Sequence, residues 1–355
     1  MLIDRIGKLK AGFAEEFDGH VIANEINMLY LTGFLGAAVM FVPNEGESIL
    51  YVYGVNYEGA RTKAKNCRVE RVKRDEEAFK KLADQIKAMK LKTLCFDSMS
   101  FQAYQKFKNA LERSVSLEGK SEYIWSLRRI KDDEELKRMR KAAELTAAGM
   151  QRACDVVKPG IKEIEVAAEI EYEMRKYGSH GVAFDTIVAS GPHSAYPHGG
   201  CCERRLAKGD LVVIDIGATY MNYRSDMTRT VVIGKASRKQ KKIYDVVKEA
   251  QEAAFQRIRD GVKAARPDAD ARSLIDEAGY GDYFVHGLGH GVGLEVHEQP
   301  VLNTSSKDIL KSGNVVTDEP GVYIVGFGGF RIEDTILVRK GKAERLTKGL
   351  YVLET

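Results

Sequence analysis

The sequence predicts an α+β protein made of a small α/β part followed by a larger part in which helices cover an antiparallel sheet. The chain has 355 residues, more than one typical domain needs and enough for two sizeable cores. Short β-branched runs in its second half alternate with glycine-rich turns, as in successive β-hairpins. Longer segments with apolar residues at helical spacing separate these runs. We therefore expect two domains, residues 1–125 and residues 126–355.

The first part combines short strands with amphipathic helices. Apolar runs at 37–42 and 48–53 flank the segment 43–46, which contains proline and glycine, so these runs predict a hairpin. We further expect a helix over 76–89, a strand over 94–97 and a helix over 101–113. Because none of these segments carries a catalytic motif, we interpret this part as a support or dimerisation domain.

The second part contains long helices, which we expect over 133–157, 163–177 and 239–261. Proline and glycine at 159–160 end the first helix, and Gly178 ends the second. The stretch 264–272 has little apolar bulk, so we expect a loop there that leads into a short helix over 273–278. These helices would cover the outer face of the sheet.

Acids inside apolar, strand-like segments are the most informative feature of the chain. Asp215 interrupts an apolar run, and a buried carboxylate needs a partner. Asp226 lies in the next β-branched run. A fold-back between Tyr220 and Asn222 would place the two acids roughly opposite each other. Cross-strand Cβ atoms lie about 4.5 to 5.5 Å apart, where two carboxylates repel each other unless a cation compensates them.

A second hairpin is expected over 319–338, with the glycine-rich segment 326–329 as its turn. Glu319 and Glu333 would then face each other across this hairpin. Because side chains alternate between the two faces of a strand, Arg331 would lie on the same face as Glu333 and point at the site.

An imidazole is available from a glycine-rich segment, in which the backbone can approach its neighbours closely. Five of the seven histidines lie between residues 190 and 300, namely His193, His198, His286, His290 and His297. Any one of the acids could cap a strand or pair with a base, but four carboxylates with the His290 imidazole suit two divalent cations. Oxygen-rich ligation with one histidine favours Mn, Co, Fe or Zn over Ca.

Taken together, these residues resemble the metal site of the dinuclear metallopeptidases of family M24, most closely the prolidases and aminopeptidases P. The resemblance includes His198 in the segment 190–199 and covers the whole chain, because the segment 27–34 is similar to the family's N-terminal domain. It implies a pita-bread catalytic domain, with a curved antiparallel sheet covered by helices, behind a creatinase-like N-terminal domain.

The resemblance also implies a role for each expected ligand. Asp226 and His290 would bind one metal ion, and Asp215 would bind the other. Asp226 and Glu333 would bridge the two ions. Glu319 would complete the site and would act as general base and then as acid for a metal-bridging hydroxide that attacks the peptide carbonyl.

Around the metals, the resemblance places His198, His297 and Arg331 as further catalytic residues, and His286 and His193 beside the substrate pocket. The implied enzyme is an exopeptidase that hydrolyses the bond between an N-terminal residue and proline. Its cofactors would be two divalent ions, Mn or Co before Fe or Zn. Its substrates would be proline-containing peptides, and it would form a homodimer.

Two positions depart from the pattern of the family. Val301 stands where prolidases often carry an arginine that grips the carboxylate of a dipeptide. Loss of such a charge-assisted hydrogen bond costs about 1.5 to 3 kcal/mol, or roughly ten- to a hundredfold in affinity, so we expect longer Xaa-Pro peptides to be favoured. Asn314 stands where relatives usually place methionine, and we expect it to change only local packing.

The composition argues against several other classes of protein. The chain has 55 basic and 51 acidic residues, so its net charge of +4 does not point to nucleic acid or an anionic membrane as a partner. No apolar run is long enough to span a membrane, and the N-terminus lacks the apolar core of a signal peptide, so we expect a cytoplasmic protein. The five cysteines form neither an even set nor paired CxxC spacings and are expected to be reduced.

Two other functions fit the same fold, because a fold does not determine an activity. One is a binding or regulatory protein that keeps the fold without hydrolysis, and the other is a hydrolase of a small non-peptide amide. The complete set of expected ligands favours the peptidase over the binding protein. Failure on every proline peptide despite bound metal would indicate the non-peptide hydrolase.

Overall fold

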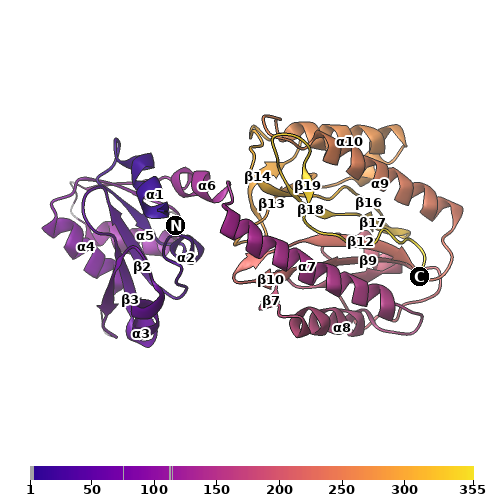
Figure 1. Ribbon diagram of the computed structural model, residues 1–355, viewed down its shortest axis with the longest axis horizontal. Helices are drawn as coiled ribbons and strands as arrows, with labels where there is room; N and C mark the ends of the chain where they lie inside the picture. Colours follow the sequence, from indigo (N-terminus) through magenta and orange to yellow (C-terminus); the bar gives the residue numbers. More distant parts are fainter. Residues whose placement is uncertain (1–3, 75, 112, 114) are drawn as a thin grey trace. The chain divides into compact units, whose positions relative to one another are not determined.

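The computed structural model describes residues 4–74, 76–111, 113 and 115–355. Contacts along the chain divide it into two compact units, Met1–Arg128 and Arg129–Thr355 (Figure 1). Helix α6 (Glu122–Arg128) packs on α1 (Arg5–Phe13), so the residues that follow position 125 stay with the first unit.

In the first unit, the described strands form one mixed sheet in the order β4-β3-β2-β1-β5-β6. These strands are β1 (Gly19–Ile22), β2 (Val39–Pro43), β3 (Ile49–Tyr53), β4 (Arg68–Val72), β5 (Thr93–Phe96) and β6 (Ser116–Gly119). The pairs β1-β2 and β2-β3 are antiparallel, whereas β3-β4, β1-β5 and β5-β6 are parallel. The predicted hairpin is confirmed as β2-β3.

The other helices of this unit are α2 (Glu25–Thr32), α3 (Gly54–Lys63), α4 (Ala78–Ala88) and α5 (Phe101–Ala110). Helices α4 and α5 correspond to the two helices predicted there, and position 112 of the second prediction lies outside the described residues. Leu82, Ile86 and Phe107 are buried in the core that these helices form with the sheet.

The second unit begins with α7 (Asp133–Val156) and α8 (Glu163–Lys176), which form where they were predicted. A capping box between Asp132 and Glu135 satisfies the first backbone N–H groups of α7. Helix α9 (Arg238–Arg257) is shorter than the predicted range 239–261, because Ile258 leaves the helix in an extended conformation and packs into the core.

The predicted loop at 264–272 is wrong, because this stretch forms most of helix α10 (Ala265–Glu277). Pro267 lies in the first turn, where its missing N–H is not needed for the helix. Asp268 and Arg272 form an ion pair of 3.0 Å one turn apart. Ala271 and Ile275 are fully buried in the core that α10 shares with α9, and this burial stabilises the helix.

The strands of the second unit pair in antiparallel fashion. Among the described residues of this unit, they form four small sheets with the strand orders β12-β9-β8, β14-β13-β15-β18-β19, β16-β17 and β11-β10-β7. The strands are β7 (Gly181–Val182), β8 (Ile187–Ser190), β9 (Leu211–Ile216), β10 (Ala218–Tyr220), β11 (Tyr223–Arg224), β12 (Met227–Val232), β13 (Gly289–Gly291), β14 (Glu298–Leu302), β15 (Val315–Asp318), β16 (Gly321–Ile324), β17 (Gly328–Arg331), β18 (Asp334–Leu337) and β19 (Glu344–Arg345). Two short 3₁₀ turns, η1 (Gly191–Ala195) and η2 (Gly281–Tyr283), connect them to neighbouring segments.

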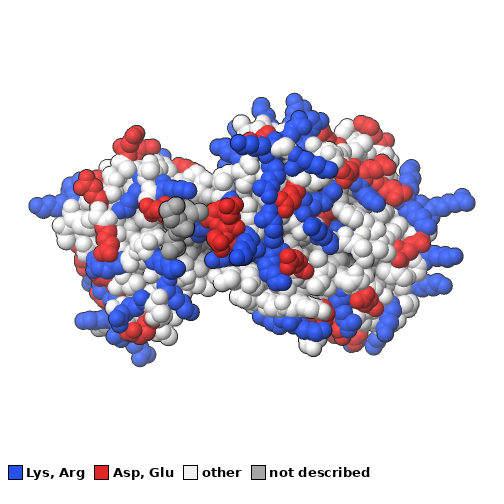
Figure 2. All heavy atoms as spheres, viewed as in Figure 1, with Lys and Arg blue, Asp and Glu red and all other residues white. Residues whose placement is uncertain are grey.

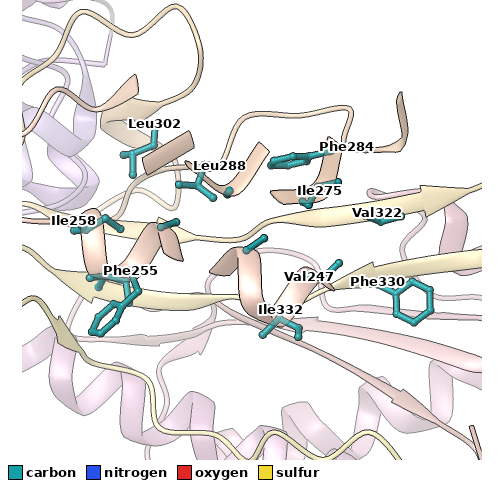
Figure 3. Close-up of a cluster of buried hydrophobic side chains, with 14 of the residues drawn as sticks. Val247, Phe255, Ile258, Ile275, Phe284, Leu288, Leu302, Val322, Phe330 and Ile332 are labelled. Carbon is teal, nitrogen blue, oxygen red and sulfur yellow. The ribbon is translucent and has the colours of Figure 1, made fainter. Parts of the chain in front are cut away.

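Two hydrophobic cores attach helices to these strands. Leu145 of α7 and Ile170 of α8 pack with Ile214 of β9 in one core. In the other core, Val247 of α9 packs with Phe330 of β17 and with further apolar side chains of α10 and β16 (Figure 3). The strands therefore lie between two helical layers, with α7 and α8 on one side and α9 and α10 on the other (Figure 1). The predicted α+β class is confirmed.

The surface agrees with the balanced composition. On the face shown in Figure 2, basic and acidic side chains are interspersed over both units. Across the described part of the chain, each helix is too short or too polar to cross a membrane. The five cysteines are all free thiols, as predicted.

Candidate metal centre

The five predicted ligands come from several strands of the second unit. Asp215 lies within β9, and Asp226 directly precedes β12. His290 is the middle residue of β13. Glu319 directly follows β15, and Glu333 directly precedes β18. The fold thus brings together residues that are more than a hundred positions apart in the sequence.

Apolar neighbours determine the direction of these side chains. Ile214 and Ile216, on either side of Asp215, are buried in the core with α7 and α8. Ile332, beside Glu333, is buried in the core with α9 and α10. Because side chains alternate along a strand, both carboxylates point away from the helices and toward the space between the two layers.

The register of the first hairpin differs from the prediction. Met221 and Asn222 form its turn with left-handed φ angles of 47° and 70°, and this turn places Thr228 opposite Asp215. The predicted pairing of Asp215 with Asp226 is therefore wrong. Asp226 is two residues away from the paired position, so it is a diagonal neighbour on the same face of the sheet.

The second hairpin has the predicted register. The strand pairs β15-β18 and β16-β17 share one alignment on either side of Glu319 and Glu333, so these two glutamates face each other. The turn consists of residues 325–327, and the glycines at 328 and 329 already belong to β17.

His290 is oriented by its backbone. Its Nδ1 lies 3.1 Å from the carbonyl oxygen of Gly291, which can only accept, so Nδ1 carries the proton. Its Nε2 lies 3.2 Å from Glu319 Oε1 and 3.9 Å from Asp226 Oδ2. A histidine that donates from one ring nitrogen and presents the other to carboxylates is arranged as a metal ligand.

Among the described residues, the negative charges of this cluster are only partly balanced. Burial raises the pKa of Asp226 and of Glu333 well above the ordinary range, and the neighbouring carboxylates add to the effect. Burial also raises the pKa of Asp215, although the Arg331 guanidinium donates to its Oδ2. Without an additional cation, this group of carboxylates therefore does not ionise completely.

Glu319 and His290 instead stabilise each other in their charged forms. Burial opposes ionisation of both groups and is the largest single effect on each, but their hydrogen bond together with the attraction of neighbouring opposite charges outweighs it. The interaction raises the pKa of His290 to about 9 and lowers the pKa of Glu319 to about 2.

The residues fit divalent metal ions. Asp215 Oδ1 and Asp226 Oδ1 are buried and accept no hydrogen bond from the described residues. Ligand atoms of Asp226, His290 and Glu333 lie within 4.8 Å of one another. A buried acceptor without a donor costs about 1 to 3 kcal/mol, and more when it is charged. A cation held by oxygen ligands and one imidazole would remove this cost.

A chain of hydrogen bonds supports the site from one side. Arg331 donates to Asp215, to Thr228 Oγ1 at 3.1 Å and to the hydroxyl oxygen of Tyr323 at 2.8 Å. The Tyr323 hydroxyl lies 3.0 Å from His286 Nε2, and His286 Nδ1 lies 2.8 Å from the Gly287 carbonyl oxygen. Because that carbonyl oxygen can only accept a hydrogen bond, Nδ1 carries the ring proton, and Nε2 accepts a hydrogen bond from Tyr323. Burial lowers the pKa of His286, in agreement with a neutral ring.

The remaining predicted histidines take different places. The ring of His297 packs edge-on against the ring of His290, with centroids 4.3 Å apart. Burial and the positive charge of His290 lower the pKa of His297. His198 is exposed. His193 directs its Nδ1 into a separate cluster on α8 and the following loop.

Three polar residues of the site were not predicted. They are Thr228, which donates to Glu333 Oε2 at 2.6 Å, Thr317, which donates to Glu319 Oε1 at 3.0 Å, and Tyr323. Strand alternation could have found them, because each lies two or four residues from a predicted ligand on the same strand or hairpin arm and therefore on the same face.

The two unusual positions also have defined places. Val301 pairs with His290 across β13 and β14, so its side chain lies on the same face as the imidazole, where it is 39% exposed. Asn314 is buried, accepts from the backbone N–H of Lys311 and donates to the carbonyl oxygen of Arg129.

Comparison with known proteins agrees with this architecture. The model of metallopeptidase family M24 matches residues 137–340, and the model of the creatinase/prolidase N-terminal domain matches residues 5–130. A Xaa-Pro dipeptidase of Pyrococcus horikoshii is 42% identical over 332 residues, which are 93% of each chain.

Two solved structures cover almost the whole chain. A Xaa-Pro dipeptidase from Bacillus anthracis superposes with a TM-score of 0.94 at 36% identity, covering 99% of both chains. An X-Pro aminopeptidase from Thermotoga maritima superposes with a TM-score of 0.89 at 33% identity, covering 99% of this chain and 100% of the other. With its pita-bread catalytic unit and its creatinase-type N-terminal unit, the chain belongs to metallopeptidase family M24 and is a metallopeptidase.

Proposed function

We propose that this metallopeptidase hydrolyses the bond between an N-terminal residue and a following proline. The observation that carries the proposal is the group of buried carboxylates around one imidazole, in which Asp215 Oδ1 and Asp226 Oδ1 accept no hydrogen bond from the described residues. The similar proteins named as Xaa-Pro dipeptidases and as an X-Pro aminopeptidase support the substrate class.

The metal ligands in this proposal are Asp215, Asp226, His290, Glu319 and Glu333. Their oxygen-rich set suits two divalent ions, Mn or Co before Fe or Zn. Bound there, such ions would lower the pKa of a water molecule and would stabilise negative charge on the peptide carbonyl oxygen.

Glu319 is the proposed proton carrier. Its carboxylate remains ionised because its pKa is lowered to about 2, mainly through the hydrogen bond that opposes the effect of burial. It can therefore accept a proton from the attacking water and deliver that proton to the proline nitrogen as the bond breaks. Thr317 holds the same carboxylate at Oε1 and restricts its rotation.

Two histidines are proposed to contact the substrate. His297 lies against the His290 ring, and its lowered pKa keeps it neutral near pH 7. A neutral imidazole can donate to the carbonyl oxygen of the scissile bond or accept from the substrate. His198, which is exposed on the loop that follows η1, would approach from the open side. We assign His286 a supporting role through Tyr323.

Arg331 is proposed to position Asp215 and not to touch the substrate. Its side chain is 3% exposed and is engaged with Asp215, Thr228 and Tyr323 and with the carbonyl oxygen of Pro197. Four of the five N–H donors of this buried guanidinium are used within the protein, so we assign it the function of holding one carboxylate in place.

Two observations bear on whether the protein prefers dipeptides or longer Xaa-Pro peptides. Two of the similar proteins are named as dipeptidases and one as an aminopeptidase. Val301 favours longer peptides, because an apolar side chain beside His290 cannot pair with the carboxylate of a dipeptide. We propose an aminopeptidase-like preference for peptides longer than two residues as the second candidate.

The test compares Ala-Pro with Ala-Pro-Ala after removal of metal and separate restoration of Mn or Co, with released alanine measured by chromatography. Cleavage of either peptide that depends on metal is expected. Preference for the tripeptide, with a shift toward Ala-Pro in Val301→Arg, would support the second candidate. Preference for Ala-Pro in the parent protein would establish a dipeptidase that holds the carboxylate by another group. No cleavage of either peptide with metal bound would overturn the proposed substrate class.

We also propose that the N-terminal unit serves as the support or dimerisation domain. The match of this unit to the creatinase/prolidase N-terminal domain supports the assignment. Light scattering of the intact chain would test it, with a homodimer as the expected result.

A further inference from the structure

A second group of possible metal ligands lies outside the candidate metal centre. It consists of Glu163, the first residue of α8, His193 in η1, and Cys202 in the loop that follows. We refer to these three residues as the α8 triad. A carboxylate, an imidazole and a thiol together form a ligand set that binds zinc in many proteins.

The ligand atoms of the α8 triad converge on one point. His193 Nδ1 lies 3.0 Å from Glu163 Oε2, and Cys202 Sγ lies 3.0 Å from the same oxygen. The sulfur and the ring nitrogen are 3.9 Å apart. All three atoms therefore lie within 4.8 Å of one another, as in the candidate metal centre.

These distances are close to those around a tetrahedral zinc ion. Bonds of about 2.3 Å to sulfur and about 2.0 to 2.1 Å to nitrogen and oxygen place the ligand atoms of such an ion roughly 3.3 to 3.6 Å apart. The three observed distances differ from this range by a few tenths of an ångström. Small side-chain rotations would therefore admit the ion, and no movement of the backbone is required.

The triad is held in place by its surroundings. Glu163 is completely buried, and it accepts from the backbone N–H of Ser190 at 2.7 Å and from the Ser190 hydroxyl at 2.6 Å. Although burial opposes it, hydrogen bonds from Cys202, Ser190 and His193 lower the pKa of Glu163, so the carboxylate is charged. Gly199 lies so close to His193 Nε2 that a Cβ there would be 2.9 Å away, which leaves Nδ1 as the nitrogen that faces the triad.

One side of the triad is open to solvent. Cys202 is exposed and His193 is partly exposed, so an ion could enter and could keep a water molecule as its fourth ligand. In the absence of metal, the hydrogen bond to Glu163 raises the pKa of the Cys202 thiol, so the sulfur is a proton donor. Metal binding would release this proton.

We propose that Glu163, His193 and Cys202 bind one zinc ion at a site separate from the candidate metal centre. The ion would join the loop after η1 to the beginning of α8. The same loop carries His198 and presents the carbonyl oxygen of Pro197 to Arg331 at 3.3 Å. A bound ion would therefore stiffen one wall of the candidate active site. The inference does not depend on the proposed substrate.

Cobalt absorption provides a test that does not rely on activity. The candidate ligands of the catalytic centre contain only oxygen and nitrogen, so a thiolate-to-cobalt charge-transfer band reports on the α8 triad. The intact protein is first loaded with Mn, reduced with a reagent that does not bind metal, and then titrated with Co²⁺. We expect one band in the near ultraviolet, saturation of that band at the intensity of one cobalt-bound thiolate per chain, and its loss on addition of Zn²⁺, which binds such ligands more tightly.

Matched variants identify the sulfur. Cys202→Ser keeps a hydroxyl that can donate to Glu163, so it should fold normally but lose the band. Cys201→Ser, a change of the adjacent cysteine, should keep the band. His193→Asn should weaken binding by about tenfold or more. Circular dichroism of each variant checks that the fold is retained.

Several results would overturn the proposal. Absence of the band in the parent protein would mean that the three residues only hydrogen-bond to one another. Retention of the band in Cys202→Ser, or its loss in Cys201→Ser, would place the thiolate elsewhere. Unchanged cobalt affinity in His193→Asn would remove the imidazole from the site.

Discussion

Each of the two units buries an aspartate, and the two aspartates differ in the hydrogen bonds that their carboxylates accept. Asp97, at the end of β5 in the N-terminal unit, accepts hydrogen bonds from Ala23 N, Asn27 Nδ2 and Ser98 N at 2.9, 2.8 and 2.6 Å. Asp226 in the catalytic unit is just as buried, but its Oδ1 accepts none from the described residues. Burial raises the pKa of both aspartates. The candidate ligand is therefore distinguished by a carboxylate oxygen that accepts no hydrogen bond from the described residues, and not by burial or by residue type.

A third aspartate sharpens this comparison. Asp318 is fully buried on the opposite face of the same strands, and neither of its carboxylate oxygens accepts a hydrogen bond from the described residues. Its neighbour Asp334 accepts hydrogen bonds from Arg229, Thr347 and Tyr351. Burial raises the pKa of Asp318 well above the ordinary range, so it is kept protonated. Carboxylate oxygens that accept no hydrogen bond therefore indicate a metal site only where several candidate ligands, including an imidazole, converge.

The largest effect is expected from Glu319→Gln. An amide cannot accept the proton from the attacking water, so kcat should fall by about 10²- to 10⁴-fold. Metal content, measured by mass spectrometry, should fall much less, because the other four candidate ligands remain. Near-parental turnover in the metal-loaded variant would remove Glu319 from the proton transfer.

The next effect concerns Asp226→Asn. This change removes a ligand and also one of the mutually repelling carboxylates. We expect the metal-free variant to be at least as stable as the metal-free parent, while the rise in melting temperature on addition of Mn is reduced or lost. Thermal unfolding with and without Mn measures both. A metal-free variant that is clearly less stable would mean that Asp226 is a structural residue like Asp97.

Asp97→Asn should have the opposite outcome. Either orientation of the amide places its NH₂ group against two backbone or side-chain donors, so we expect a loss of about 1 to 3 kcal/mol in the free energy of unfolding. Trp125 is the single tryptophan of the chain and lies in the N-terminal unit, so its fluorescence in denaturant follows this unit. Turnover per folded molecule should be unchanged, and a selective loss of turnover would contradict the contrast with Asp226.

The last effect appears only at acid pH and concerns His20, a buried residue of β1 whose ring nitrogens have no hydrogen-bond partner among the described residues. Burial lowers its pKa to about 3, well below the value of an unfolded histidine. The unfolded chain therefore takes up a proton first, and stability that is complete above pH 6.5 is lost as the pH falls toward 3, by about 1.4 kcal/mol per pH unit.

The control for this prediction is His20→Leu, an apolar side chain of similar size. It should weaken the acid sensitivity of the Trp125 fluorescence transition between pH 6.5 and pH 4. Identical pH dependence of the parent and the variant would show that His20 is not the group responsible.

Much of the fold followed from local sequence. The helices α7 and α8 and the hairpin β2-β3 appear where periodicity and turn residues predicted them, because these signals act between near neighbours. Helix α10 did not, because its first two turns carry only alanine as apolar side chains apart from Pro267, and its stability depends on burial of Ala271 and Ile275 beside α9. The pairing of Asp215 with Thr228 depended on a two-residue turn whose position shifts every partner in the hairpin.

By itself, the sequence determined which residue types were available as ligands and on which strand faces they lie, because side chains alternate along a strand whatever it packs against. Only the tertiary structure decided three outcomes. Asp226 Oδ1 accepts no hydrogen bond from the described residues while Asp97 accepts several, Tyr323 links His286 to Arg331, and His193 lies against Glu163 and Cys202. Each of these outcomes depends on contacts between segments distant in the chain, and such contacts are set by how helices and sheets pack.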